Sequence, residues 1–114
     1  VDLKSIADNR FFCGWERGEV GDLSEPGMAE FLDRISPCNH TERITKPLYM
    51  NVGGRDPRVL PEPGRKMAEA MEQAGREVWY TEIPDAGHGI GGAAPPDIIY
   101  VATSIVEFLE RIRE

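Results

Sequence analysis

The order of apolar runs in the second half of the chain constrains the fold more than any other feature. The run "PLYMNV" (47–52) is short and apolar and ends in two glycines, which predicts a buried strand. The run "EVWYTEI" (77–83) is rich in β-branched and aromatic residues and predicts a second strand. A helical pattern follows each run. Strands linked in this way pair in parallel, so the sequence predicts an α/β sheet with helices on its faces.

The two helices that follow the strands carry apolar stripes at helical spacing. The first is expected over residues 63–74, with Gly75 as its C-terminal cap. The second is expected to start near Asp97, a suitable N-cap residue. The stripe of the first consists of Met67, Ala70, Met71 and Ala74, and that of the second of Ile98, Val101, Ala102, Ile105, Leu109 and Ile112. We expect both stripes to be buried.

The first part of the chain, residues 1–46, is less regular and reads as a loop and helical segment. Residues 14–22 ("GWERGEVGD") contain three glycines and four charges, which predicts a surface loop. The triplet "SEP" (24–26) is typical of a helix start, and Pro37 predicts the helix end. The apolar stripe of this helix would consist of Met28, Phe31, Leu32 and Ile35.

A sheet of two parallel strands leaves both edges and much of both faces without cover. Residues 1–36 offer at most one further short strand. We therefore expect the chain to be the C-terminal part of a larger α/β domain, or to complete its sheet with another chain. By itself it should associate through its open sheet edges. The chain begins at Val1 without a signal peptide, so we also expect sequence upstream of this residue.

Composition excludes several classes of partner. The formal net charge of −7 argues against nucleic acid or an anionic membrane surface as the main partner. No run approaches the roughly 18 apolar residues that a membrane span requires. The two cysteines, Cys13 and Cys38, are too few for a disulfide framework and leave both their pairing and the compartment open.

One acidic residue and one histidine occupy equivalent positions after the two strands. Asp56 lies in "GGRDPR" after the first, and His88 lies in "PDAGHG" after the second. Because functional groups gather at the carboxyl ends of parallel strands, we expect these side chains at one edge of the sheet. A carboxylate beside an imidazole fixes its tautomer and stabilises its protonated form. Taken singly, Asp56 could instead be a turn former that binds its own backbone.

Most of the chain resembles the C-terminal end of the catalytic domain of the prolyl oligopeptidase family of serine peptidases. The resemblance rests on "ISPCNHTERITKPLYMNVGGRDPRV" followed by "MAEAMEQAGREVWYTEIPDAGHG", which keep the family's order of motifs. It implies a partial α/β-hydrolase catalytic domain over 1–114, of which 47–114 form the terminal β-α-β-α part. It also implies that Asp56 is the acid and His88 the base of a catalytic triad. Related esterases and dienelactone-hydrolase-like proteins share much of this pattern.

The nucleophile motif of such enzymes, Gly-x-Ser-x-Gly, does not occur in these 114 residues. The resemblance places the nucleophile and the oxyanion hole upstream, so we expect this chain alone to be inactive. The complete enzyme would cleave peptides or small esters without a cofactor. Cys38 and His40 lack a second ligand pair and predict no metal site, and His40 is interpreted as a surface or capping residue. The alternative function is non-catalytic, an α/β remnant that binds a partner or drives assembly.

Overall fold

The computed structural model describes residues 2–9 and 20–113. Two short helices come first, α1 (Leu3–Ala7) and α3 (Met28–Ile35), followed by two 3₁₀ turns, η1 (Pro37–Asn39) and η2 (Thr41–Arg43). The remainder runs β1 (Leu48–Gly53), α4 (Pro61–Gln73), β2 (Val78–Ile83), the 3₁₀ turn η3 (His88–Ile90) and α5 (Pro95–Arg113). The predicted strand, helix, strand, helix order is therefore confirmed.

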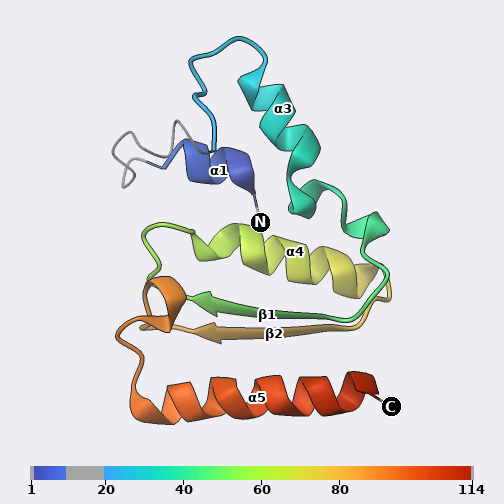
Figure 1. Ribbon diagram of the computed structural model, residues 1–114, viewed down its shortest axis with the longest axis vertical. Helices are drawn as coiled ribbons and strands as arrows, with labels where there is room; N and C mark the ends of the chain where they lie inside the picture. The colour runs from blue at the N-terminus through green and yellow to red at the C-terminus, as the bar shows by residue number, and fades with distance from the viewer. Residues whose placement is uncertain (1, 10–19, 114) are drawn as a thin grey trace.

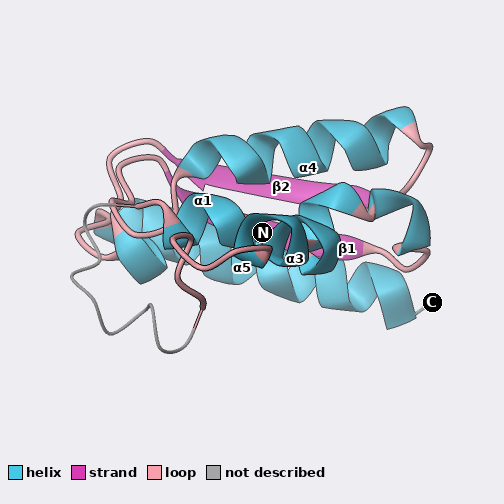
Figure 2. Ribbon diagram, turned by 90° about the horizontal axis from the view of Figure 1, so that it is seen from above, coloured by secondary structure: helices cyan, strands magenta, loops and turns pink. Residues whose placement is uncertain are grey.

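The two strands form a parallel sheet, as the sequence predicts. Their register pairs Leu48 with Val78 at one end and Gly53 with Ile83 at the other. Helix α4 covers one face of the sheet and α5 covers the other, so this part of the molecule has three layers with the sheet in the middle (Figure 1). The loops that follow both strands gather at one end, and the C-terminus lies at the opposite end (Figure 1 and Figure 2). None of the described helices is long and apolar enough to cross a membrane.

The alternation of side chains along the strands decides which helix each one meets. On the α4 side, Gly64 lets the helix approach Val52, because an added Cβ would lie only 3.1 Å from a methyl carbon of that residue. On the α5 side, Phe108 packs against Tyr49 and Trp79, with both ring centroids 5.7 Å away. Aromatic contacts of this kind attach the helix to neighbouring strands.

The predicted stripe of α4 is confirmed at its centre and wrong at its end. Met67 and Met71 are buried, together with Ala68, whereas Ala74 is exposed because it lies just past the last helical residue, Gln73. Gly75 adopts a φ of +69°, the left-handed conformation that the cap prediction required. The core near the strand ends is a cluster of Ile83, Ala86 and Val101, against which Ile90 and Ala93 pack.

The predicted buried face of α5 is largely wrong. Only Val101 of that stripe is buried, and the helix packs through Val101, Ser104 and Phe108. The exposed members of the predicted stripe are Ile98, Ala102, Ile105, Leu109 and Ile112. Two strands form a narrow surface that covers one strip of a long helix, so the rest of the apolar side faces outward.

The first helical segment also differs from the prediction. Helix α3 begins at Met28 with Gly27 as N-cap, later than the predicted start at 24–26. Ser24 does not cap the helix, because its N–H and hydroxyl both donate to Oδ1 of Asp22. Leu32 is buried, whereas Phe31 and Ile35 of the same predicted stripe are exposed. The helix ends before Pro37, as predicted. Residues 14–19 of the predicted loop, and Cys13 before it, lie outside the described residues, and the described residues before β1 contain no strand.

Candidate active site

The loops that follow β1 and β2 are in close backbone contact, which two glycines at the end of β1, Gly53 and Gly54, make possible. A Cβ on Gly53 would lie 2.2 Å from the carbonyl oxygen of Gly87, and one on Gly54 would lie 2.6 Å from that of Pro84. The close approach allows the N–H of Arg55 to donate to the carbonyl of Ala86 at 2.9 Å. This hydrogen bond thus fixes the first loop against the second at residues that shortly precede Asp56 and His88 in the sequence. The sequence signal for this role is the glycine doublet that directly ends the strand.

Asp56 lies in the first loop, and both of its carboxylate oxygens are engaged. Oδ1 accepts the backbone N–H groups of Arg58 at 2.8 Å and Val59 at 3.0 Å. Oδ2 lies 2.9 Å from Nδ1 of His88. The expected turn-forming role and the expected histidine partner therefore coexist in one carboxylate. Asp56 is only 8% exposed, because it lies where the second loop packs against the first.

Opposing influences act on the charge of the Asp56 carboxyl group. Burial raises its pKa, since it disfavours the charged form, whereas the N–H groups of Val59 and Arg58 and the side chain of His88 lower it. The pKa lies below its ordinary value as a net result. The carboxylate is therefore ionised at neutral pH, the state in which it can orient an imidazole.

His88 is presented by a tight loop. The N–H of Gly91 donates to the carbonyl of His88, and the N–H of Gly87 donates to the carbonyl of Gly91 at 2.8 Å. Gly89 adopts a φ of +61° and Ile90 a φ of +57°, an unusual conformation for a β-branched residue. Packing of Ile90 against the cluster around Ile83 stabilises this strained backbone. The loop is thus held by hydrogen bonds on one side and by the core on the other.

The imidazole of His88 is about half exposed, with a side-chain exposure of 49%. It borders a cavity of about 400 Å³ that runs along the outer edge of β1 past Tyr49, Asn51 and Gly53. Since Nδ1 faces Asp56, Nε2 is the ring atom available to exchange a proton with a group entering from outside. This is the division of labour that general base catalysis requires of a histidine.

The second histidine, His40, lies outside this constellation. The Nε2 of His40 contacts the carbonyl of Arg34 at the end of α3, which confirms its interpretation as a capping residue. Arg58 contributes its backbone N–H to the site. Within the described residues, no three Asp, Glu, His or Cys side chains gather as a metal site would require.

Sequence reasoning missed one residue near the site. The side-chain amide of Asn9 donates to the carbonyls of Pro57 and Arg58 in the Asp56 turn, at 2.7 and 3.0 Å. Nothing in the sequence signals this contact, because 48 or more positions separate the partners.

Comparison with known proteins bears on the ancestry of this constellation. The family model described as the prolyl oligopeptidase family matches residues 5–113. The chain belongs to the prolyl oligopeptidase family. It is 33% identical over 70 residues, 61% of the chain, to the dipeptidyl aminopeptidase BIII of Pseudoxanthomonas mexicana. It is 33% identical over 69 residues to the dipeptidyl peptidase family member 6 of Caenorhabditis elegans. It is 32% identical over 79 residues, 68% of the chain, to the acylamino-acid-releasing enzyme 2 of Oryza sativa subsp. japonica.

The family membership applies to a short stretch of much longer proteins. The matched region is 10%, 9% and 10% of these three relatives, so the chain spans about a tenth of their length. No solved structure gives a significant match. The parallel two-stranded α/β arrangement is compatible with a part of the catalytic domain of such a peptidase.

Proposed function

We propose that this chain is the part of a serine peptidase catalytic domain, of the α/β-hydrolase type, that carries the triad acid and the triad base. Asp56 is the acid and His88 the base. The nucleophilic serine and the oxyanion hole come from outside these 114 residues. The observation that carries the proposal is the 2.9 Å contact between Oδ2 of the buried Asp56 and Nδ1 of the half-exposed His88.

The geometry supports a defined role for each group. Oδ2 of Asp56 accepts a hydrogen bond from Nδ1–H of His88, which keeps the proton on Nδ1 and leaves Nε2 unprotonated and directed outward. Nε2 then removes the proton of the serine hydroxyl as the serine attacks the substrate carbonyl. The resulting imidazolium is stabilised by the carboxylate and returns the proton to the leaving amine. The same cycle, with water as the attacking group, releases the acyl product.

Peptides are the substrate class that we favour. The three relatives are named as two dipeptidyl peptidases and an acylamino-acid-releasing enzyme, which supports cleavage near the N-terminus of a peptide. Small esters are the alternative substrate class, and assays with both substrate types distinguish the two.

The test compares three variants of the full-length protein that supplies the serine. His88→Ala should abolish turnover, and Asp56→Asn should lower kcat by about 10⁴-fold because the imidazole keeps the wrong tautomer. His40→Ala is the matched control, since this histidine contacts Arg34 at the end of α3 and Glu42, outside the site, and should stay within about threefold of the parent. Circular dichroism checks that each variant folds.

The outcomes separate the candidate functions. Full turnover of a folded His88→Ala variant would contradict the assignment of the base. Turnover of aryl esters but of no peptide would replace the peptidase by an esterase. If the full-length protein lacks both activities and a serine-directed fluorophosphonate does not label it, the non-catalytic alternative holds.

A further inference from the structure

The contact between Asn9 and the Asp56 turn has a definite chemical direction. Both partners of the Asn9 side chain are backbone carbonyls, those of Pro57 and Arg58. Carbonyl oxygens only accept hydrogen bonds, so the NH₂ end of the amide, which carries two N–H donors, faces them. Asn9 thus directs its side-chain donor group at two carbonyls of one turn.

The two carbonyls belong to the peptide groups that hold Asp56. The carbonyl of Pro57 and the N–H of Arg58 are parts of one planar peptide group. The carbonyl of Arg58 and the N–H of Val59 are parts of the next. Both N–H groups donate to Oδ1 of Asp56. Each peptide plane is therefore fixed at its oxygen by Asn9 and at its hydrogen by the carboxylate.

This arrangement does two things for the carboxylate. Fixing two peptide planes orients Oδ1, and with it the direction in which Oδ2 faces His88. A donor at the carbonyl also polarises the peptide group and strengthens the bond that its N–H makes. Since those N–H bonds lower the pKa of Asp56, they help to keep the carboxyl group ionised against the opposing effect of burial.

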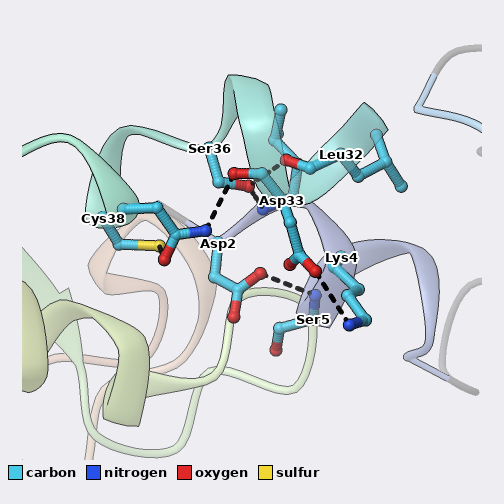
Figure 3. Close-up of polar contacts among 9 residues, drawn as sticks. Asp2, Lys4, Ser5, Leu32, Asp33, Ser36 and Cys38 are labelled. Atoms are coloured by element: carbon cyan, nitrogen blue, oxygen red, sulfur yellow. Dashed lines mark hydrogen bonds and ion pairs between the residues drawn. The ribbon is translucent and has the colours of Figure 1, made fainter. Parts of the chain in front are cut away.

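Asn9 is itself held in place by α1. Its backbone N–H donates to the carbonyl of Ile6 at the end of that helix. The start of the helix is attached to α3, since the N–H of Leu3 donates to Oγ of Ser36 at 2.9 Å and Lys4 pairs with Asp33 at 3.0 Å (Figure 3). Ser36 is fully buried and donates in turn to the carbonyl of Leu32. The side-chain amide of Asn9, which binds the Asp56 turn, is therefore attached through α1 to α3.

We propose that Asn9 is a positioning residue for the catalytic acid: it fixes the two peptide groups that hold Asp56 and so keeps that carboxylate aimed at His88. The inference rests on the proposed function, because it gives Asn9 its role through the Asp56–His88 pair.

A double-mutant cycle in the full-length enzyme tests it, with kcat and KM measured on one peptide substrate. Asn9→Ala should lower kcat by about tenfold, the factor that one or two neutral hydrogen bonds are worth, with little change in KM. Asn9→Asp should lose more, because its carboxylate oxygens would face carbonyl oxygens. Asn9→Gln keeps the donors and should recover part of the loss. In an Asp56→Asn background, Asn9→Ala should change kcat by less than about twofold, because the group that it positions is gone.

Asn39 provides the matched control. Its side-chain amide also donates to a backbone carbonyl, that of Asp33 at 2.8 Å, but within the α3 region. Asn39→Ala should leave kcat unchanged in both backgrounds. A loss from Asn9→Ala that multiplies with that of Asp56→Asn, or that Asn39→Ala reproduces, would overturn the inference and indicate a role in stability alone. Full turnover of Asp56→Asn would instead overturn the proposed function.

Discussion

Replacing Gly53 with alanine should separate the two loops that form the candidate site. The new Cβ would lie 2.2 Å from the carbonyl oxygen of Gly87 and 2.7 Å from that of Ala86. An ordinary contact begins at 3.4 Å, so one loop must move by about 1.2 Å. Both obstacles are backbone atoms, and no side-chain rotation can relieve them. The bond from Arg55 N–H to Ala86, now 2.9 Å, would exceed the roughly 3.2 Å limit of a good hydrogen bond.

The cost can be estimated from these two effects. Overpacking costs about 1 to 3 kcal/mol, and one lost backbone hydrogen bond about 1 kcal/mol. We therefore expect Gly53→Ala to lower the free energy of unfolding by about 3 kcal/mol. At about 4 °C per kcal/mol for a chain of this length, the melting temperature should fall by about 12 °C. In the full-length enzyme, kcat should fall as well, because the carboxylate and the imidazole are carried by the loops that separate.

Gly87→Ala is the matched control for this experiment. Its Cβ would meet only the carbonyl oxygen of Gly91, at 3.5 Å, and its φ of −90° is open to alanine. It should melt within a few degrees of the parent. Calorimetry at one protein concentration and amide hydrogen exchange at Arg55 are the measurements. If Gly53→Ala melts like Gly87→Ala and Arg55 exchanges at the parental rate, the loops do not approach as described and the reasoning fails.

Three further predictions concern the 114-residue chain. The pKa of Glu82 is lowered to about 2 by its hydrogen bonds with Arg65 and Tyr80, so its contribution to stability is present above about pH 4.5 and is lost as the pH falls toward 2. Glu82→Gln should therefore flatten the loss of stability over that range in urea titrations; an unchanged slope would contradict this. The chain should sediment as species larger than its 12.7 kDa monomer, because α5 exposes a broad apolar face, including Ile99 at 65%, and no other strand of the described residues pairs with the outer edge of β1 or β2. A monodisperse monomer at micromolar concentration would refute this. Finally, a fluorophosphonate should label none of the four serines, and stoichiometric labelling would reveal an activated hydroxyl that the sequence does not indicate.

Local sequence patterns and the order of elements along the chain determined which strands and helices form and how the strands pair. The apolar runs and the helical spacing depend on neighbouring residues, and the connection through a helix requires parallel pairing. Asp56 and His88 each lie in the loop that directly follows a strand, and this can be read from the order of residues in the chain. Their proximity could be predicted before any distance was known, because parallel strands bring their carboxyl ends to one edge.

The tertiary structure decided what depends on partners far away in the chain. A helical pattern identifies the apolar side of α5 but not how much sheet exists to cover it, so Ile98 and Leu109 are exposed while Ser104 is buried. The burial of Asp56 requires the second loop to close over the first, which the Gly53 contact permits. The hydrogen bond from Asn9 to Pro57 in the Asp56 turn joins segments 48 positions apart. Such contacts leave no periodicity in the sequence, because they arise only when packing brings the segments together.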